Sequence, residues 1–201
     1  MKGLLVDFGG VLTSNVFDSF RGFCDTEGLD PDALVSLFRE NPDTLKLLRA
    51  VETGDIAEAD FAAQLGGMLG VADTEGLVDR MFAGMQADEP MLAAVRSAKA
   101  AGIRTGLISN SLGEGRYDRS QFPELFHGVV ISGEEGMHKP NPDIYELGAE
   151  RVGLAPGDCV FVDDLRENCE GAEAVGMTAV LHRGADTTIP RLEALLGLEL
   201  R

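Results

Sequence analysis

The sequence predicts an α/β protein with a Rossmann-like parallel sheet, helices on both faces of that sheet, and an inserted α-helical cap. Short, wholly apolar runs that end in glycine or polar residues are typical of strands buried on both faces. Amphipathic helical patterns separate the later runs, as in a parallel sheet. Residues 15–85 contain no such run. We therefore expect residues 1–14 and 86–201 to form the α/β core and residues 15–85 to form a helical cap.

Five apolar runs are the predicted strands, and three helical patterns lie between the later ones. Glycines or polar residues close each run, which stops a strand at a defined point. The expected strands are 4–8, 103–109, 128–132, 159–163 and 177–181. The expected helices of the core are 90–101, 142–153 and 166–175.

The segment 15–85 carries several helix start signals. Asp30-Pro31 and Asn41-Pro42 each combine a capping residue with a proline at the first helical position. Asp55 with Glu58 three residues later resembles a capping box. These signals predict four or five short helices, inserted over the carboxyl ends of the strands, where open α/β sheets bind ligands.

Composition limits the possible partners and the compartment. The 201 residues include 34 Asp and Glu against 17 Lys and Arg, a net charge of −17, which argues against nucleic acid and anionic membranes. Three cysteines make no disulfide framework, which favours a reducing cytoplasm. No apolar stretch reaches the ~18 residues of a membrane helix. We expect a cytoplasmic protein, monomeric or homodimeric.

Polar side chains stand where the predicted strands end. Asp7 follows the first strand, Ser109-Asn110 ends the second, and Asp163-Asp164 ends the fourth. Lys139 lies between the third strand and its helix. Because carboxyl ends of parallel strands share one edge of the sheet, these groups should meet in one crevice.

This set of groups suits phosphoryl transfer. Three neighbouring carboxylates repel one another unless a cation lies among them. Oxygen ligands without His or Cys select a hard ion such as Mg²⁺. A carboxylate such as Asp7 can attack phosphorus, while Lys139 neutralises charge and the Ser109 hydroxyl donates a hydrogen bond. The residues thus predict metal-assisted phosphoryl transfer through Asp7.

Four motifs in order resemble the haloacid dehalogenase (HAD) superfamily across nearly the whole chain. They are Asp7-Phe8-Gly9-Gly10-Val11-Leu12, Leu107-Ile108-Ser109-Asn110, Lys139-Pro140, and Phe161-Val162-Asp163-Asp164 with Asn168. The helical insert is similar to the family's C1 cap. The resemblance is greatest to the HAD-IA hydrolases, including the amino-terminal phosphatase domain of epoxide hydrolases.

The resemblance implies a role for each matching position. Asp7 would be the nucleophile and a metal ligand, and Asp164 a direct ligand of Mg²⁺. Asp163 would bind the metal through water or lie beside it, and the Gly9 carbonyl would complete the protein ligands. Ser109 and Lys139 would hold the phosphoryl oxygens, and we also expect Asn110 to contact the substrate. The expected activity is Mg²⁺-dependent hydrolysis of a small phosphorylated metabolite.

Gly9 departs from the family pattern, because family phosphatases usually carry there an Asp that acts as general acid and base. That proton transfer is worth about 10²–10⁴ in rate. Either the substrate has a good leaving group, or another residue (Thr13, Ser14 or a cap residue) or a water acts, or the protein is slow or inactive. A carbon–halogen hydrolase and a non-catalytic binding protein are the alternatives. Asp163-Asp164 argues against the first, since dehalogenases lack that metal-binding pair.

Overall fold

A computed structural model describes residues 2–112 and 117–200, and it confirms the predicted fold class. Five parallel strands form one sheet in the order β3-β2-β1-β4-β5. They are β1 (Gly3–Val6), β2 (Arg104–Ser109), β3 (Gly128–Ile131), β4 (Cys159–Asp163) and β5 (Thr178–Leu181). Each predicted run overlaps one strand; β4 has the predicted ends, and the ends of the others differ by at most two residues. The expected third strand is one residue too long, because Ser132 begins the short helix α8 (Ser132–Glu135).

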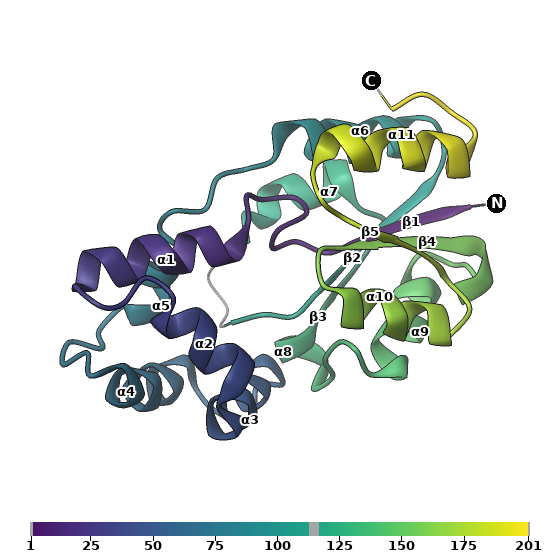
Figure 1. Cartoon of the computed structure of the whole chain (residues 1–201). Coiled ribbons are helices and arrows are strands. Elements are labelled where there is room, and N and C mark those ends of the chain that lie inside the picture. The colour runs from purple at the N-terminus through teal and green to yellow at the C-terminus, as the bar shows by residue number, and fades with distance from the viewer. Residues whose placement is uncertain (1, 113–116, 201) are drawn as a thin grey trace.

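Helices cover both faces of the sheet (Figure 1). On one face α6 (Glu89–Ala100), α7 (Phe122–Leu125) and α11 (Ala185–Leu196) pack over an apolar cluster that contains Leu4 and Val6. On the other face α9 (Pro142–Arg151) and α10 (Arg166–Ala174) pack over a cluster that contains Leu5. Successive residues of β1 therefore enter opposite cores, as in a strand buried on both sides.

Helix α11 was not among the predicted helices. Pro190 lies inside it, and proline interrupts the helical pattern on which sequence prediction depends. Helix α9 begins at Pro142 after Asn141, as predicted, but the Asn141 side chain makes no capping hydrogen bond. The longest described helices have 12 residues, and none in residues 2–112 and 117–200 has the length and apolar character needed to cross a membrane.

Five helices lie within residues 15–85, in agreement with the expected four or five. They pack around their own apolar core, which includes Phe20, Leu34, Phe61, Leu65 and Met81. These helices lie beyond the carboxyl ends of the strands in Figure 1. They are α1 (Val16–Glu27), α2 (Ala33–Glu40), α3 (Pro42–Glu52), α4 (Glu58–Leu69) and α5 (Leu77–Phe82).

The start signals of this helical segment differ in outcome. Asn41 caps α3 as predicted, accepting hydrogen bonds from the N–H groups of Asp43 and Thr44. The prediction of a capping box at Asp55 is wrong. Helix α4 begins after Ala57, and the Asp55 carboxylate accepts a hydrogen bond from the Thr53 hydroxyl instead. Asp30-Pro31 forms a turn, and α2 begins at Ala33.

Two chain segments lie side by side where the helical segment joins the sheet. The Ser14 N–H donates to the Gln86 carbonyl at 2.7 Å, and the Asp88 N–H donates to the Leu12 carbonyl at 2.9 Å. An antiparallel bridge pairs Thr13 with Ala87 between them. The helices are therefore tied to the sheet at one edge. The division into a core and a cap domain stays a prediction.

Close packing of α10 on the loop before α9 predicts opposite effects of two glycine-to-alanine changes. A Cβ at Gly171 would lie 2.8 Å from the Pro140 carbonyl oxygen, whereas a Cβ at Gly22 in α1 would have no neighbour within 4 Å. Gly171→Ala should lower the free energy of unfolding by about 1–3 kcal/mol. Gly22→Ala should raise it by about 0.5–1 kcal/mol through helix propensity. Urea denaturation measures both, and equal effects would contradict this packing.

Candidate active site

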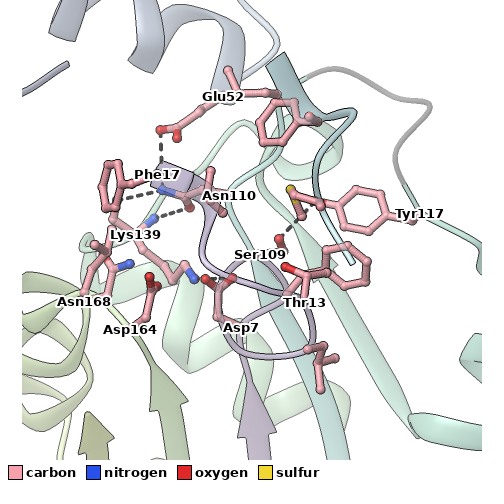
Figure 2. Close-up of a pocket in the computed structure, with 18 of the residues that line it drawn as sticks. Asp7, Thr13, Phe17, Glu52, Ser109, Asn110, Tyr117, Lys139, Asp164 and Asn168 are labelled. Carbon is pink, nitrogen blue, oxygen red and sulfur yellow. Dashed lines mark hydrogen bonds and ion pairs between the residues drawn. The ribbon is translucent and has the colours of Figure 1, made fainter. Parts of the chain in front are cut away.

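Asp7 lies at the centre of the sheet edge, immediately after β1. Its N–H donates to the Val162 carbonyl at 2.9 Å, which extends the pairing with β4 by one residue. The neighbouring strands β2 and β4 end in Ser109 and Asp163. The strand order thus places Asp7 between these two side chains, at the bottom of the crevice in Figure 2.

Lys139 binds two of the carboxylates. Its ammonium lies 2.7 Å from Asp7 Oδ1 and 2.7 Å from Asp163 Oδ2, and 3% of the residue is exposed. Asn110 holds the backbone of Lys139 from both sides. The Asn110 amide oxygen accepts from the Lys139 N–H at 2.9 Å, and its nitrogen donates to the Lys139 carbonyl at 3.1 Å (Figure 2). Asn110 therefore positions Lys139.

Asp163 and Asp164 stand in different environments despite being neighbours in sequence. Asp163 is fully buried, and its two oxygens accept hydrogen bonds from Lys139, the Leu165 N–H and the Asn168 amide at 2.7–3.1 Å. Asp164 is partly exposed and lines the crevice. Gly10, with φ +73°, makes room for it, since a Cβ at Gly10 would lie 2.5 Å from Asp164 Oδ2.

The three carboxylates form one charged group. Carboxylate oxygens of Asp7, Asp163 and Asp164 lie within 4.8 Å of one another. Burial raises the pKa of Asp7 to about 7, against the opposing effect of Lys139. Burial, and then the charge of Asp163, raise the pKa of Asp164 to about 6. Burial works against the Lys139 ammonium, but Asp163 and Asp7 keep its pKa above the usual value.

The donor set fits a divalent cation. Fully ionised, three carboxylates and one ammonium leave an excess of two negative charges, which a Mg²⁺ ion would balance. Every ligand atom in the group is oxygen, the donor that Mg²⁺ prefers. The oxygens of Asp163 are already bound to protein donors, whereas Asp164 faces the crevice. Asp7 and Asp164 are therefore the side chains best placed to hold the ion.

Ser109 and Gly9 also lie at the crevice. The Ser109 hydroxyl accepts a hydrogen bond at 3.0 Å from the hydroxyl of Tyr117, a residue that no sequence motif marked. Burial raises the pKa of Tyr117 to about 12, so it stays protonated. Gly9 lines the crevice without a side chain. A Cβ there would meet one atom within 4 Å, Val16 Cγ2 at 3.1 Å.

Thr13 and Ser14, the predicted alternatives for proton transfer, are engaged with backbone. The Thr13 hydroxyl accepts from the Gly10 N–H at 3.0 Å and donates to the Ser14 carbonyl at 3.1 Å. The Ser14 hydroxyl accepts from the Gln86 N–H at 3.0 Å. Both side chains thus hold the loop that follows β1.

A cavity of about 890 Å³ opens from the carboxylates towards the helical segment. The sheet edge supplies its polar end, and the helices supply an apolar wall that includes Val16, Phe17, Phe20, Phe38, Leu45, Leu48 and Phe82. Glu52, the last residue of α3, is a partly buried carboxyl group on that wall that sequence reasoning missed. Nothing in its helical pattern distinguishes it from a solvated glutamate.

The chain matches a protein-family model described as haloacid dehalogenase-like hydrolase over residues 1–176. A sesquiterpene phosphatase of Aspergillus oryzae is 30% identical over 155 residues, 73% of this chain and 77% of the relative. The acyl-CoA dehydrogenase family member 10 of Mus musculus is 27% identical over 99% of this chain. The bifunctional epoxide hydrolase 2 of Sus scrofa is 28% identical over 62%. This chain spans 19% and 24% of the length of those two proteins.

A solved structure has the same fold. It is a HAD family enzyme from Bacteroides thetaiotaomicron in complex with magnesium and inorganic phosphate. The TM-score is 0.68 at 20% identity, over 92% of this chain and 95% of that chain.

The buried ion pairs predict that Lys139→Met is strongly destabilising. The change leaves Asp7 and Asp163 without their shared cation, which typically costs about 3–5 kcal/mol. The exposed Lys46, 3.6 Å from Asp43, is the control, and Lys46→Met should stay within about 0.5 kcal/mol of wild type. Chemical denaturation of both variants provides the comparison. A Lys139→Met protein as stable as the control would show that the pairs do not hold the site.

Proposed function

The chain belongs to the haloacid dehalogenase-like hydrolases, and from this premise we propose that it is a Mg²⁺-dependent phosphatase for small phosphomonoesters. The observation that carries the proposal is the placement of Asp7, with Lys139 at 2.7 Å and Asp164 beside it, at the base of the cavity. The sesquiterpene phosphatase relative supports phosphorus, rather than carbon, as the atom attacked.

Asp7, Asp164 and the Gly9 carbonyl would hold the metal ion. When bound, the ion neutralises charge on the phosphoryl oxygens and so reduces the repulsion between phosphate and carboxylate. Asp163 has a separate task, because its oxygens hold Lys139, Asn168 and the Leu165 N–H. Asp163 thus fixes the Lys139 ammonium beside the position that a phosphoryl oxygen of the substrate would take.

Asp7 is the nucleophile in this proposal. One carboxylate oxygen bonds to phosphorus, the ester P–O bond breaks, and its electron pair leaves with the alcohol oxygen. Lys139 keeps its proton and neutralises the transferring group. The Ser109 oxygen already accepts from Tyr117, so its own hydrogen points elsewhere and can bond a phosphoryl oxygen. Water then hydrolyses the aspartyl phosphate.

The charges around the cavity favour a substrate with one phosphate and no second anionic group. Lys139 and the exposed Arg39 are the cationic side chains among the described residues that line it. Carboxylates of Asp79, Asp118 and Glu167 line it as well, and they would repel a second phosphate or carboxylate. The apolar wall from the helices would contact the organic part of the ester.

Replacing the nucleophile gives the first test of this function. Asp7→Asn should lower kcat on every turned-over monoester in a panel of phosphorylated metabolites by at least about a thousandfold, since covalent catalysis is lost. EDTA should abolish wild-type turnover. Haloacid hydrolysis that survives EDTA would favour carbon–halogen chemistry. Tight binding of vanadate with Mg²⁺, without turnover of any ester, would favour a non-catalytic protein.

Metal binding should depend on pH in a defined direction. Asp7 and Asp164 have raised pKa values, so their contribution to the stability of the metal-free protein is present below about pH 4 and lost as the pH rises through about 6–7. Mg²⁺ competes with those protons. In thermal melts, 1 mM Mg²⁺ should therefore raise Tm more at pH 8 than at pH 5. An equal rise at both pH values, or an undiminished rise in Asp164→Asn, would contradict this site.

A further inference from the structure

We propose that Glu52 is the general acid that protonates the departing alcohol oxygen, the task that Gly9 cannot perform. The inference rests on the proposed phosphatase activity and adds a catalytic residue to it. The proposed proton donor lies on the helical segment. In the family pattern the acid lies instead on the loop after β1.

The direction of the reaction dictates where a proton donor must stand. An in-line displacement at phosphorus sends the leaving oxygen away from the nucleophile. Asp7 lies at the sheet edge, so the leaving oxygen points into the cavity, towards the helical segment. A donor on that side can reach it, and Glu52 lines the cavity from that side.

Glu52 is held in place by contacts to the sheet edge. Its backbone carbonyl accepts a hydrogen bond at 2.5 Å from the hydroxyl of Ser132, which begins α8 directly after β3. Two residues on, Gly54 lies so close to the Gly133 carbonyl that an added Cβ would stand 3.0 Å from its oxygen. The end of α3 is thus docked onto the core, which fixes the base of the Glu52 side chain.

The Glu52 carboxyl points down into the cavity, towards Asn110 (Figure 2). The Asn110 amide nitrogen lies 3.4 Å from Glu52 Oε2, and the same amide bonds both backbone groups of Lys139. Asn110 therefore links the carboxyl group to the lysine that holds Asp7. In the same view Glu52 lies at the top of the cavity and Asp7 at its bottom, and both line it.

The other carboxyl groups on the cavity wall are less suited to the task. Asp79 and Glu167 are exposed. Asp118 accepts hydrogen bonds from Ser120 and Gln121 of its own turn, which lower its pKa and keep it ionised. Asp164 belongs to the metal group. Among the described residues that line the cavity, Glu52 is thus the partly buried carboxyl group that does not belong to the metal site.

The charge environment of Glu52 favours the protonated form that an acid requires. Burial raises its pKa to about 8. Of the charged groups that face it, Lys139 and Arg49 lower the pKa, and Asp7 raises it. At pH 7 the side chain is therefore mostly the neutral carboxylic acid, ready to donate.

The step is balanced in protons and electrons. As Asp7 bonds to phosphorus, the P–O bond to the alcohol breaks and its electron pair stays on the alcohol oxygen. Glu52 transfers its proton to that oxygen and becomes a carboxylate. When water attacks the aspartyl phosphate, the Glu52 carboxylate takes a proton from that water and returns to its starting form.

Leaving-group dependence tests the proposal, with n-hexyl phosphate and 4-nitrophenyl phosphate as probes. An alkoxide needs a proton to leave, whereas 4-nitrophenolate leaves without one. Glu52→Gln should therefore lower kcat on n-hexyl phosphate by about a hundredfold or more, and on 4-nitrophenyl phosphate by less than about tenfold. The fall of wild-type kcat/KM on n-hexyl phosphate above about pH 8 should disappear in the variant.

Three further variants separate catalysis from structure. Glu52→Asp keeps the acid and should retain more n-hexyl phosphate turnover than Glu52→Gln. Gly9→Asp in the Glu52→Gln background should restore it, because an added Cβ at Gly9 meets a single side-chain atom, Val16 Cγ2 at 3.1 Å, which a small shift relieves. Glu40→Gln, an exposed carboxyl at the end of α2, should match wild type on both esters.

Equal losses on both esters, or no loss on either, would overturn the role of Glu52 and leave the phosphatase activity standing. A wild-type protein that hydrolyses neither ester, or whose turnover survives Asp7→Asn, would instead overturn the proposed function itself.

Discussion

The crevice depends on the balance between three carboxylates and one ammonium. Asp7, Asp163 and Asp164 meet within 4.8 Å, and Lys139 contacts the first two at 2.7 Å. Burial makes this balance demanding, because each uncompensated charge there costs several kcal/mol. Lys139 alone leaves the three carboxylates with excess negative charge. A divalent cation bound there would balance that charge and would take part in phosphoryl transfer. Two asparagines keep these charges in position: Asn110 holds the backbone of Lys139, and Asn168 holds the Asp163 carboxylate.

Catalytic groups come from both sides of the cavity in this account. The sheet edge supplies the nucleophile and the lysine, on strands buried between two apolar cores. The helical segment supplies the apolar wall and Glu52, and it is tied to the sheet by the pairing of Thr13 with Ala87. Because the end of α3 is docked on the residues that follow β3, Glu52 keeps its place above the sheet edge.

Sequence predicted the sheet well because each buried strand is a continuous apolar run, and it predicted Asp7 and Asp163 because their positions follow directly from strand ends. It predicted helix starts unevenly. Asn41 caps α3, but Asp55 bonds Thr53 instead of opening α4, a choice between local hydrogen bonds that spacing does not reveal. Glu52 could not be found, since its position comes from the docking of α3 on the distant α8, and that contact leaves no periodic signal.

Capture of the covalent intermediate tests the central claim most directly. The protein is mixed with Mg²⁺ and a turned-over monoester, quenched with borohydride during turnover, and the peptide that contains residue 7 is analysed by mass spectrometry. An aspartyl phosphate at Asp7 is reduced to homoserine, so homoserine at position 7 is the predicted result, absent without Mg²⁺. Unmodified Asp7 in an enzyme that is turning over, or reduction at another carboxylate, would contradict the account.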